Sequence, residues 1–258
     1  MIEVKHLSKR FGKVQVLTDI NAKFYKGRIN QIIGKSGSGK SVLAKCIVGL
    51  HQPEEGEVLY DGKSFHAMEV DEKRDIRKRI GMLFQGSALF DSLTVLQNVM
   101  FPLQMFGEMP KSEMAERAHT CLQRVNIMDK DKLFPAELSG GMQKRVGIAR
   151  AIAMNPEYLF VDEPNSGLDP QTSILIDDLI KELTEEFNTT TIVITHDMNS
   201  VMEIGENILF ISGGRLAWNG SRDELLDTDN QDLNEFIFAG SLMRNAKEFM
   251  RGKSSGKR

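Results

Sequence analysis

The stretch Gly34-Lys35-Ser36-Gly37-Ser38-Gly39-Lys40-Ser41 matches the pattern G-x-x-x-x-G-K-[ST], in which a loop wraps nucleotide phosphates. The run from Ile29 to Ile33 predicts a buried strand before the loop, and apolar residues at helical spacing from Val42 to Leu50 predict a helix after it. The motif requires this context, which disfavours the alternative of a flexible Gly/Ser loop with a chance lysine. The stretch therefore predicts an α/β nucleotide-binding fold.

The residue types in this loop suit an anion. Glycines without a Cβ let backbone NH groups approach phosphate oxygens, and the start of the following helix adds a partial positive charge. We expect Lys40 to reach the β and γ phosphates and Ser41 to offer its hydroxyl to Mg²⁺. The residues predicted to bind ATP along this segment are Gly34, Lys35, Ser36, Gly37, Ser38, Gly39, Lys40, Ser41 and Val42.

Composition limits the class of protein. The 258 residues can form a large core with an inserted lobe, and the net charge of -3 argues against nucleic acid as the main partner. Cys46 and Cys121 fit no disulfide or metal pattern, so we expect core residues in a reducing compartment. The start of the chain lacks signal-peptide features and no apolar run approaches bilayer-spanning length, so a membrane role requires a partner.

The N-terminal part predicts an antiparallel layer of three short strands, over Ile2 to Leu7, Val14 to Leu17 and Ile20 to Phe24. Phe11 lies between the first two, where an aromatic ring stacks on adenine or packs in the core, and spacing alone favours the core. Further on, the strand from Ile80 to Phe84 stops at Gln85, which is well placed at the carboxyl edge of a sheet.

An inserted helical lobe is predicted next, with helices over Leu93 to Phe106 and Lys111 to Val125. Its methionines suit either core filling or an adaptable partner surface, and the sequence does not decide between these. The segment Leu138-Ser139-Gly140-Gly141 then opens a helix that runs to about Ala153. Its hydroxyl and NH groups suit an anion, although taken alone an ordinary serine N-cap is the simpler interpretation.

Carboxylates follow the next buried strand, which runs from Tyr158 to Asp162 and Glu163. A buried charge at a strand end needs a partner, and Asp162 has one if it holds the Mg²⁺ that Ser41 binds. Glu163 is then expected to accept a proton from the attacking water. His196 follows the strand from Thr191 to Ile194; a lone histidine is usually structural, but at this edge it can bond to a γ-phosphate.

These motifs, in this order and spacing, resemble the ATP-binding cassette (ABC) ATPases over about residues 1–221. The resemblance implies an α/β P-loop NTPase fold with a RecA-like core, an antiparallel β subdomain and an inserted α-helical subdomain. The expected boundaries are 1–85 and 157–222 for the core with its β layer, 86–156 for the helical part, and 223–258 for a helical extension with a basic tail. Residues 82–95 and 98–103, with Met142, resemble the ATPases of bacterial MCE-associated systems that move phospholipids.

The resemblance also implies a homodimer around two ATP molecules, each held by the phosphate loop of one subunit and by Ser139, Gly140 and Gly141 of the other. Gln85 would sense Mg²⁺ and link the site to the helical lobe, which would dock on a membrane permease. Phe11 becomes the expected adenine stack, although the family more often has tyrosine there. The implied catalytic residues are Glu163, His196 and Gln85, the implied Mg²⁺ ligands are Ser41, Gln85 and Asp162, and Asp169 would communicate across the dimer.

The leading hypothesis is an ATPase at the cytoplasmic face of a bacterial inner membrane that drives lipid traffic through a permease and an MCE-type lipid-binding protein, with a small regulatory partner left open. The alternative is an importer ATPase for amino acids or another solute. A soluble ABC ATPase acting on DNA repair or the ribosome is disfavoured by the single cassette and the acidic balance. A regulator without turnover would lack Glu163 or His196. Residues Leu233 to Arg251 are a candidate dimer clamp, and Asn165 departs from the family without an assigned role.

Overall fold

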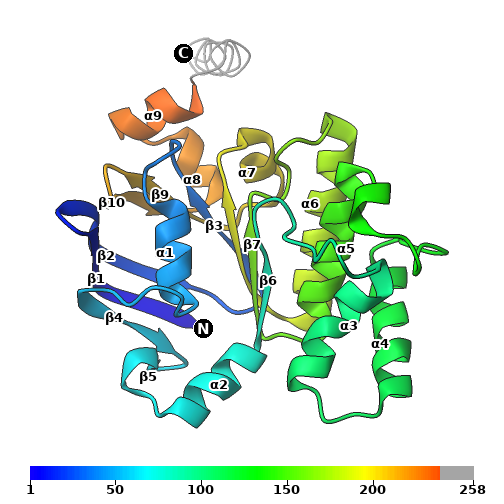
Figure 1. Cartoon of the computed structure of the whole chain (residues 1–258). Coiled ribbons are helices and arrows are strands. Elements are labelled where there is room, and N and C mark those ends of the chain that lie inside the picture. Colours follow the sequence, from blue (N-terminus) through cyan, green and yellow to red (C-terminus); the bar gives the residue numbers. More distant parts are fainter. Residues whose placement is uncertain (239–258) are drawn as a thin grey trace.

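The computed structural model describes residues 1–238 and contains a central six-stranded sheet of order β10-β9-β3-β8-β7-β6 (Figure 1). All neighbouring strands run parallel except β10 against β9. The carboxyl ends of β3, β8, β7 and β6 therefore meet at one edge, where open α/β sheets bind ligands. The strand bounds are β3 Arg28–Ile33, β6 Ile80–Leu83, β7 Tyr158–Asp162, β8 Thr190–Thr195, β9 Asn207–Ser212 and β10 Arg215–Gly220.

The second sheet is antiparallel, with order β2-β1-β4-β5. Its strands are β1 (Ile2–Phe11), β2 (Val14–Phe24), β4 (Glu55–Tyr60) and β5 (Lys63–Ser64), so the prediction of three short N-terminal strands is wrong. The pairing of β1 with β2 continues through register shifts, and His6 and Asp19 both take a left-handed φ of 50°. Their side chains meet with His6 Nδ1 2.8 Å from Asp19 Oδ1. Polar residues such as these are typical of strand ends, but here they lie at a bulge within two continuous strands.

Helix α1 (Lys40–Ile47) stands between the two sheets (Figure 1). Its apolar side chains share one buried cluster with residues of β1, β2, β4, β7, β8 and β9. The helix begins two residues earlier than predicted because Gly39, at a φ of 106°, turns the loop directly into it. Cys46 on this helix and Cys121 in the helical lobe are both buried, as the sequence predicted.

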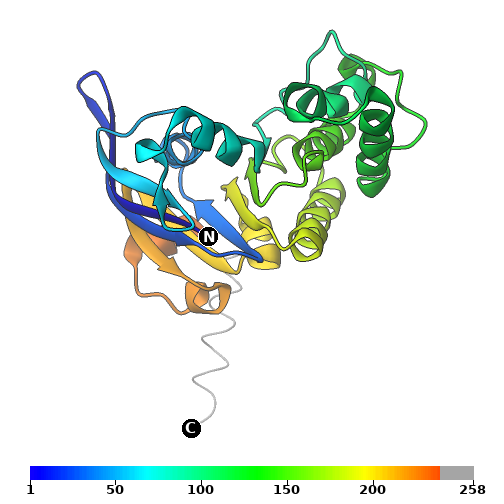
Figure 2. The ribbon, with the colours of Figure 1, turned by 90° about the horizontal axis from the view of Figure 1, so that it is seen from below.

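The helical lobe consists of α3 (Val95–Phe106), α4 (Lys111–Arg124) and α5 (Gly140–Ile152), which Figure 2 shows to one side of the sheets. A stripe of buried residues on and just after α4 joins them: Ala118, Cys121, Leu122 and Val125. The methionines are largely core residues, since Met100 is buried and Met109 and Met114 pack on the same cluster. Met105 alone of these four is more than half exposed. The shorter elements before and within the lobe are η1 Phe65–Ala67, α2 Val70–Lys78 and η2 Pro135–Glu137.

The last part contains α6 (Pro170–Phe187) and α7 (Met198–Ile204). Helices α8 (Arg222–Leu226) and α9 (Gln231–Ile237) form the described part of the predicted C-terminal extension. Leu233 and Ile237 are buried in a cluster with Phe210 of the same chain. Residues 239–251 of the predicted dimer clamp lie outside the described residues. Within residues 1–238 no helix combines the length and apolar character needed to cross a bilayer.

Candidate functional site

Side chains from four loops meet at the carboxyl edge of the central sheet. They surround a cavity of about 390 Å³. Its lining residues are Val16, Ser36, Gly37, Gly39, Lys40, Ser41, Val42, Gln85, Glu163 and His196. The structure thus brings the phosphate loop after β3 together with the residues that follow β6, β7 and β8, because these strands are parallel neighbours.

The phosphate loop is a tightly constrained turn. Gly34 has a φ of +149°, and a Cβ there would collide with the carbonyl oxygen of Ile211. Lys40 is only 7% exposed, and its Nζ donates to the carbonyl oxygens of Gly34 at 2.8 Å and Lys35 at 3.1 Å. Burial lowers the pKa of Lys40, while the nearby Glu163 and Asp162 act in the opposite direction. The cavity is therefore lined by the Lys40 cation and by glycines and serines of the loop, an arrangement that suits a phosphate.

Glu163 occupies a strained backbone position. Its φ is 50°, a left-handed conformation that a residue with a side chain adopts only when its surroundings impose it. The carboxylate Oε1 lies 2.9 Å from His196 Nδ1, in a hydrogen bond across the ends of β7 and β8. His196 is largely exposed, whereas the Glu163 side chain is 12% exposed. The pair is thus oriented beside the phosphate loop, where a water molecule and a γ-phosphate would meet.

Asp162 ends β7 and is only 6% exposed. Burial raises the pKa of its carboxyl, with Glu163 acting in the same direction and Lys45, Lys40 and Lys144 opposing. Its Oδ1 has no hydrogen-bond partner among residues 1–238. A buried carboxylate oxygen of this kind fits a cation, and Mg²⁺ takes few protein ligands when phosphates and waters supply the rest. Within residues 1–238 no three His, Cys, Asp or Glu residues cluster as a metal site.

A second cavity, of about 430 Å³, contains the other predicted nucleotide contacts. Ser139, Gly140, Gly141 and Asp169 line it, and it shares no lining residue with the first cavity. Ser139 caps α5 by accepting a hydrogen bond from the Met142 NH at 3.3 Å, and Asp169 caps α6 by accepting one from the Thr172 NH at 3.0 Å. One chain therefore presents its two anion-suited loops in separate places.

The structure places Phe11 at the surface and not in the core. It is 45% exposed, so the core placement that spacing favoured is wrong. It lies at the end of β1 and meets His51 edge to face, with ring centroids 5.3 Å apart. Val16 lines the phosphate cavity and Phe11 does not. The role of Phe11 in stacking on adenine stays a prediction.

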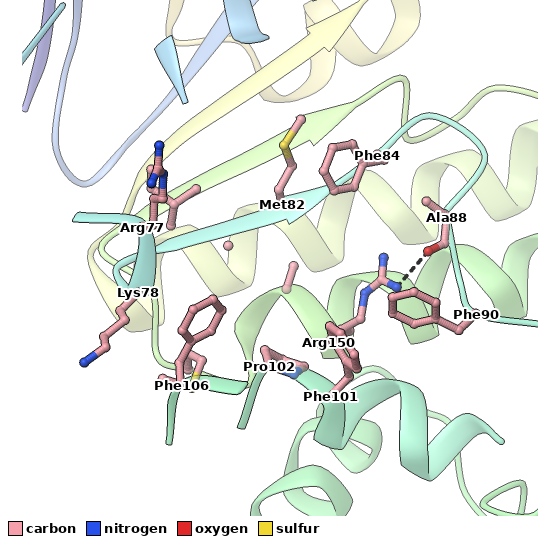
Figure 3. Close-up of a pocket in the computed structure, with 14 residues that line it drawn as sticks. Arg77, Lys78, Met82, Phe84, Ala88, Phe90, Phe101, Pro102, Phe106 and Arg150 are labelled. Carbon is pink, nitrogen blue, oxygen red and sulfur yellow. Dashed lines mark hydrogen bonds between the residues drawn. The ribbon is translucent and has the colours of Figure 1, made fainter. Parts of the chain in front are cut away.

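An apolar groove of about 420 Å³ lies where β6 meets the helical lobe (Figure 3). Met82 and Phe84 line it from the β6 side, and Phe101, Pro102 and Phe106 from α3 (Figure 3). Gln85 directly follows Phe84, so the segment that lines the groove also reaches the phosphate cavity.

Arg150 of α5 fixes the segment between that cavity and the groove. Its guanidinium donates to the carbonyl oxygens of Ser87 and Ala88, each at 2.8 Å, and lies over the ring of Phe90 at 6.0 Å (Figure 3). Phe90 in turn packs on Phe101, with ring centroids 4.6 Å apart. The segment from Gln85 to Phe90 thus connects the phosphate cavity with the apolar groove, and Arg150 and Phe101 hold it in place.

Residues 17–166 match the family model described as ABC transporter. The chain belongs to this family. An ABC ATPase structure, that of a post-hydrolysis dimer of the cassette MJ0796 bound to ADP and Pi, superposes with a TM-score of 0.79 at 36% identity and covers 86% of this chain and 99% of its own. The chain therefore has the ABC ATPase fold, binds ATP and hydrolyses it as the ATPase part of a transporter.

Two curated ABC ATPases are similar over nearly the whole chain. The intermembrane phospholipid transport ATP-binding protein MlaF of Haemophilus influenzae is 36% identical over 99% of this chain and 92% of its own length. The methionine import ATP-binding protein MetN of Clostridioides difficile is 37% identical over 94% of this chain and 75% of its own length. Because the chain is similar to both proteins to nearly the same degree, identity alone does not distinguish phospholipid from methionine as its cargo.

Lys144 is a buried residue next to the phosphate cavity that the sequence analysis did not single out. It lies on α5, is 5% exposed, and its Nζ donates to the carbonyl oxygen of Glu163 at 3.0 Å. Burial lowers the pKa of Lys144, against the effect of Asp162 and Glu163. The signal in the sequence was its position, since Lys144, Ile148 and Ala151 share a face of α5.

Replacing Lys144 with Met is expected to lower kcat for ATP hydrolysis by about tenfold, the kinetic equivalent of about 1.4 kcal/mol, because the backbone of Glu163 loses a charged donor. The dissociation constant for ATP should stay within about twofold, since Lys144 does not line the phosphate cavity and its hydrogen bond goes to Glu163. Steady-state phosphate release and equilibrium nucleotide binding measure the two quantities. Lys181→Met, an equal change on the exposed side of α6, is the control, and an unchanged kcat in Lys144→Met would contradict the prediction.

Proposed function

We propose that this chain is the ATPase subunit of a bacterial transporter that moves phospholipid between the inner and outer membranes, from the cytoplasmic face of the inner membrane. The observation that carries the proposal is the likeness to the phospholipid transport protein of Haemophilus influenzae, whose alignment extends over 99% of this chain. The segment 82–95, which suggests the same group in the sequence, forms the link between the phosphate cavity and the apolar groove.

The proposed chemistry assigns Glu163 to accept the proton of the attacking water and His196 to orient Glu163 and contact the γ-phosphate. Lys40 and the loop NH groups hold the β and γ phosphates. Ser41, Asp162 and Gln85 would hold Mg²⁺, which neutralises phosphate charge when bound. The protein acts as a homodimer in which Ser139, Gly140 and Gly141 of each subunit complete the site on the other, since these residues lie in a cavity apart from their own phosphate loop.

The proposed partner of the apolar groove is a membrane permease, which in turn contacts an MCE-type lipid-binding protein. The rings of Phe101 and Phe106 and the exposed Phe84 offer an apolar surface that a short helical segment of a permease can cover. The Gln85 segment borders both the apolar groove and the phosphate cavity. Movement of a permease segment in the groove would therefore be transmitted to the phosphates through a few residues.

Replacing Phe101 with Glu is expected to reduce recovery of membrane partners by about tenfold, because a charge in the groove opposes an apolar segment. Phosphate release by the isolated protein should stay within about twofold, since Phe101 does not line the phosphate cavity. Affinity purification of the tagged chain from detergent-solubilised native membranes measures the first quantity. Met128→Glu places the same charge on a residue that is 65% exposed outside the groove and serves as control. Equal recovery in both variants would contradict the assignment.

Methionine import is the second candidate, since five further MetN proteins match at 38–42% identity. The two functions differ in their companions. The complex purified from its native membrane should contain an MCE-type protein and carry phospholipid that organic extraction recovers. A periplasmic methionine-binding protein in the complex, with ATP turnover stimulated by methionine, would replace lipid with methionine as the cargo.

A further inference from the structure

A buried polar cluster joins three elements behind the catalytic edge. Asp177 on α6 is 4% exposed, Asn165 on the turn before α6 is 8% exposed, and Ser200 in α7 is 1% exposed. The Asn165 Nδ2 donates to both carboxylate oxygens of Asp177 at 3.0 Å, and the Ser200 hydroxyl donates to Oδ1 at 2.9 Å. One carboxylate therefore accepts hydrogen bonds from two segments that approach it from different loops.

Those two segments are the ones that adjoin the proposed catalytic pair. Asn165 follows Glu163 by two residues, and the Ser166 NH donates back to the Glu163 carbonyl at 3.3 Å. Ser200 lies in the first turn of α7, whose N-cap Asp197 directly follows His196. The cluster thus connects the backbone on the far side of Glu163 with the backbone on the far side of His196.

The turn from Asn165 to Asp169 is attached to α6 at both of its ends. Asp169 caps the first turn of α6, and Asn165 is bound to Asp177 about two helical turns further along. The side chain of Asn165 is held through its NH₂ group, since its Oδ1 has no hydrogen-bond partner among the described residues. Without Asp177 the side chain of Asn165 would lose both of these hydrogen bonds. The turn that borders the second cavity would keep its backbone hydrogen bond to Glu163 but lose its attachment to α6 at Asn165.

We propose that Asp177 is a positioning residue for ATP hydrolysis, which fixes the Asn165–Asp169 turn and the start of α7 relative to Glu163 and His196. The proposal rests on the assignment of Glu163 and His196 to hydrolysis and is independent of the cargo. It also gives a role to Asn165, the departure from the family pattern that the sequence alone left unexplained.

The cluster carries a charge at an energetic cost. Burial is the main cause that raises the pKa of Asp177 to about 6. The charges of Asp197 on α7 and Asp178 on α6 act in the same direction, and the hydrogen bonds from Asn165 and Ser200 oppose the rise. The strand β3 contributes to this region the uncharged amide of Gln31, which donates to the Ser200 carbonyl at 3.3 Å. A neutral residue of the same size would avoid this cost.

The test is Asp177→Asn, which keeps the size of the side chain, removes the charge and leaves one acceptor oxygen in place of two. At pH 8 we expect kcat to fall by about tenfold with the dissociation constant for ATP within about twofold, because a neutral oxygen is a weaker acceptor than a carboxylate. Protonated Asp177 resembles Asn, so the ratio of wild-type to variant kcat should fall toward one as the pH drops below about 6.

Stability provides the second readout, and its sign is opposite to that of activity. The folded-state pKa of Asp177 is raised, so its ionised form costs stability above pH 6, and this cost disappears as the pH falls toward the usual value of 3.8. Asp177→Asn should therefore have a higher Tm than wild type at pH 8, with the difference shrinking below pH 6. Glu185→Gln, an equal loss of charge at an exposed position of α6, should change neither kcat nor Tm appreciably.

Three results would each overturn the proposal. They are an unchanged kcat for Asp177→Asn at pH 8, a ratio of wild-type to variant kcat that is constant with pH, and a loss of kcat accompanied by a Tm below that of wild type. Glu163→Gln separates this from failure of the catalytic assignment. If Glu163→Gln keeps its turnover, the assignment of the base is wrong. If Glu163→Gln abolishes turnover while Asp177→Asn behaves like wild type, only the role of Asp177 is wrong.

Discussion

Replacing Glu163 with Gln is expected to lower kcat for ATP hydrolysis by about 10²–10⁴-fold, the range that general base catalysis contributes. The amide cannot accept the proton of the attacking water, but it keeps the length of the side chain and can still bond to His196 Nδ1, which lies 2.9 Å from Oε1 in the native protein. The affinity for ATP should hold within about threefold, because the phosphate loop is unchanged. Single-turnover phosphate release and nucleotide titration measure the two quantities.

The left-handed backbone at Glu163 makes this variant informative. Gln has the same steric demand at a φ of 50° as Glu, so the strain at this position is the same in both proteins. A loss of kcat can then be assigned to the missing base. Glu185→Gln on the exposed side of α6 controls for the loss of a charge. If Glu163→Gln turned over ATP at the wild-type rate, another group would have to accept the proton.

The sequence predicted those parts of the site whose residue types and spacing within a short segment indicate their chemical role. The phosphate loop, the carboxylates at the end of β7 and His196 after β8 each come at the end of a buried strand, and parallel pairing brings such ends together. The contacts that sequence reasoning missed join distant elements. Asn165 and Asp177 are twelve residues apart, and Ser200 is a further twenty-three residues along the chain.

Polar residues in unusual places account for two of the errors, and an exposed aromatic residue accounts for a third. Lys144 looks like a solvent-facing residue in the sequence, yet the carbonyl of Glu163 satisfies it inside the protein. His6 and Asp19 interrupt the alternation of β1 and β2 without ending either strand. Phe11 suggests a core residue, but its place next to the hairpin turn leaves it exposed. For Lys144 and for His6 with Asp19, the deciding partner is distant in the sequence, which local periodicity cannot show.

Mixing two inactive variants is expected to restore ATP hydrolysis. Lys40→Ala removes the cation of the phosphate loop, and Ser139→Arg blocks the second cavity; each homodimer should lose more than about 100-fold in kcat. In a mixed dimer, the intact phosphate loop of the Ser139→Arg subunit faces the intact Ser139 segment of the Lys40→Ala subunit. One complete site results, and equal random mixing gives about a quarter of the wild-type number of sites.

The physical basis of this expectation is the separation of the two cavities. Lys40 and Ser139 line different cavities that share no residue, and Ser139 is exposed, so an arginine at this position needs no repacking of the core. If one subunit enclosed ATP by itself, every chain in the mixture would carry one broken part and no activity would return. Phosphate release after co-refolding the two variants, compared with each variant refolded alone, measures the restored sites. Activity in the mixture no higher than in either variant alone would contradict sites shared between subunits.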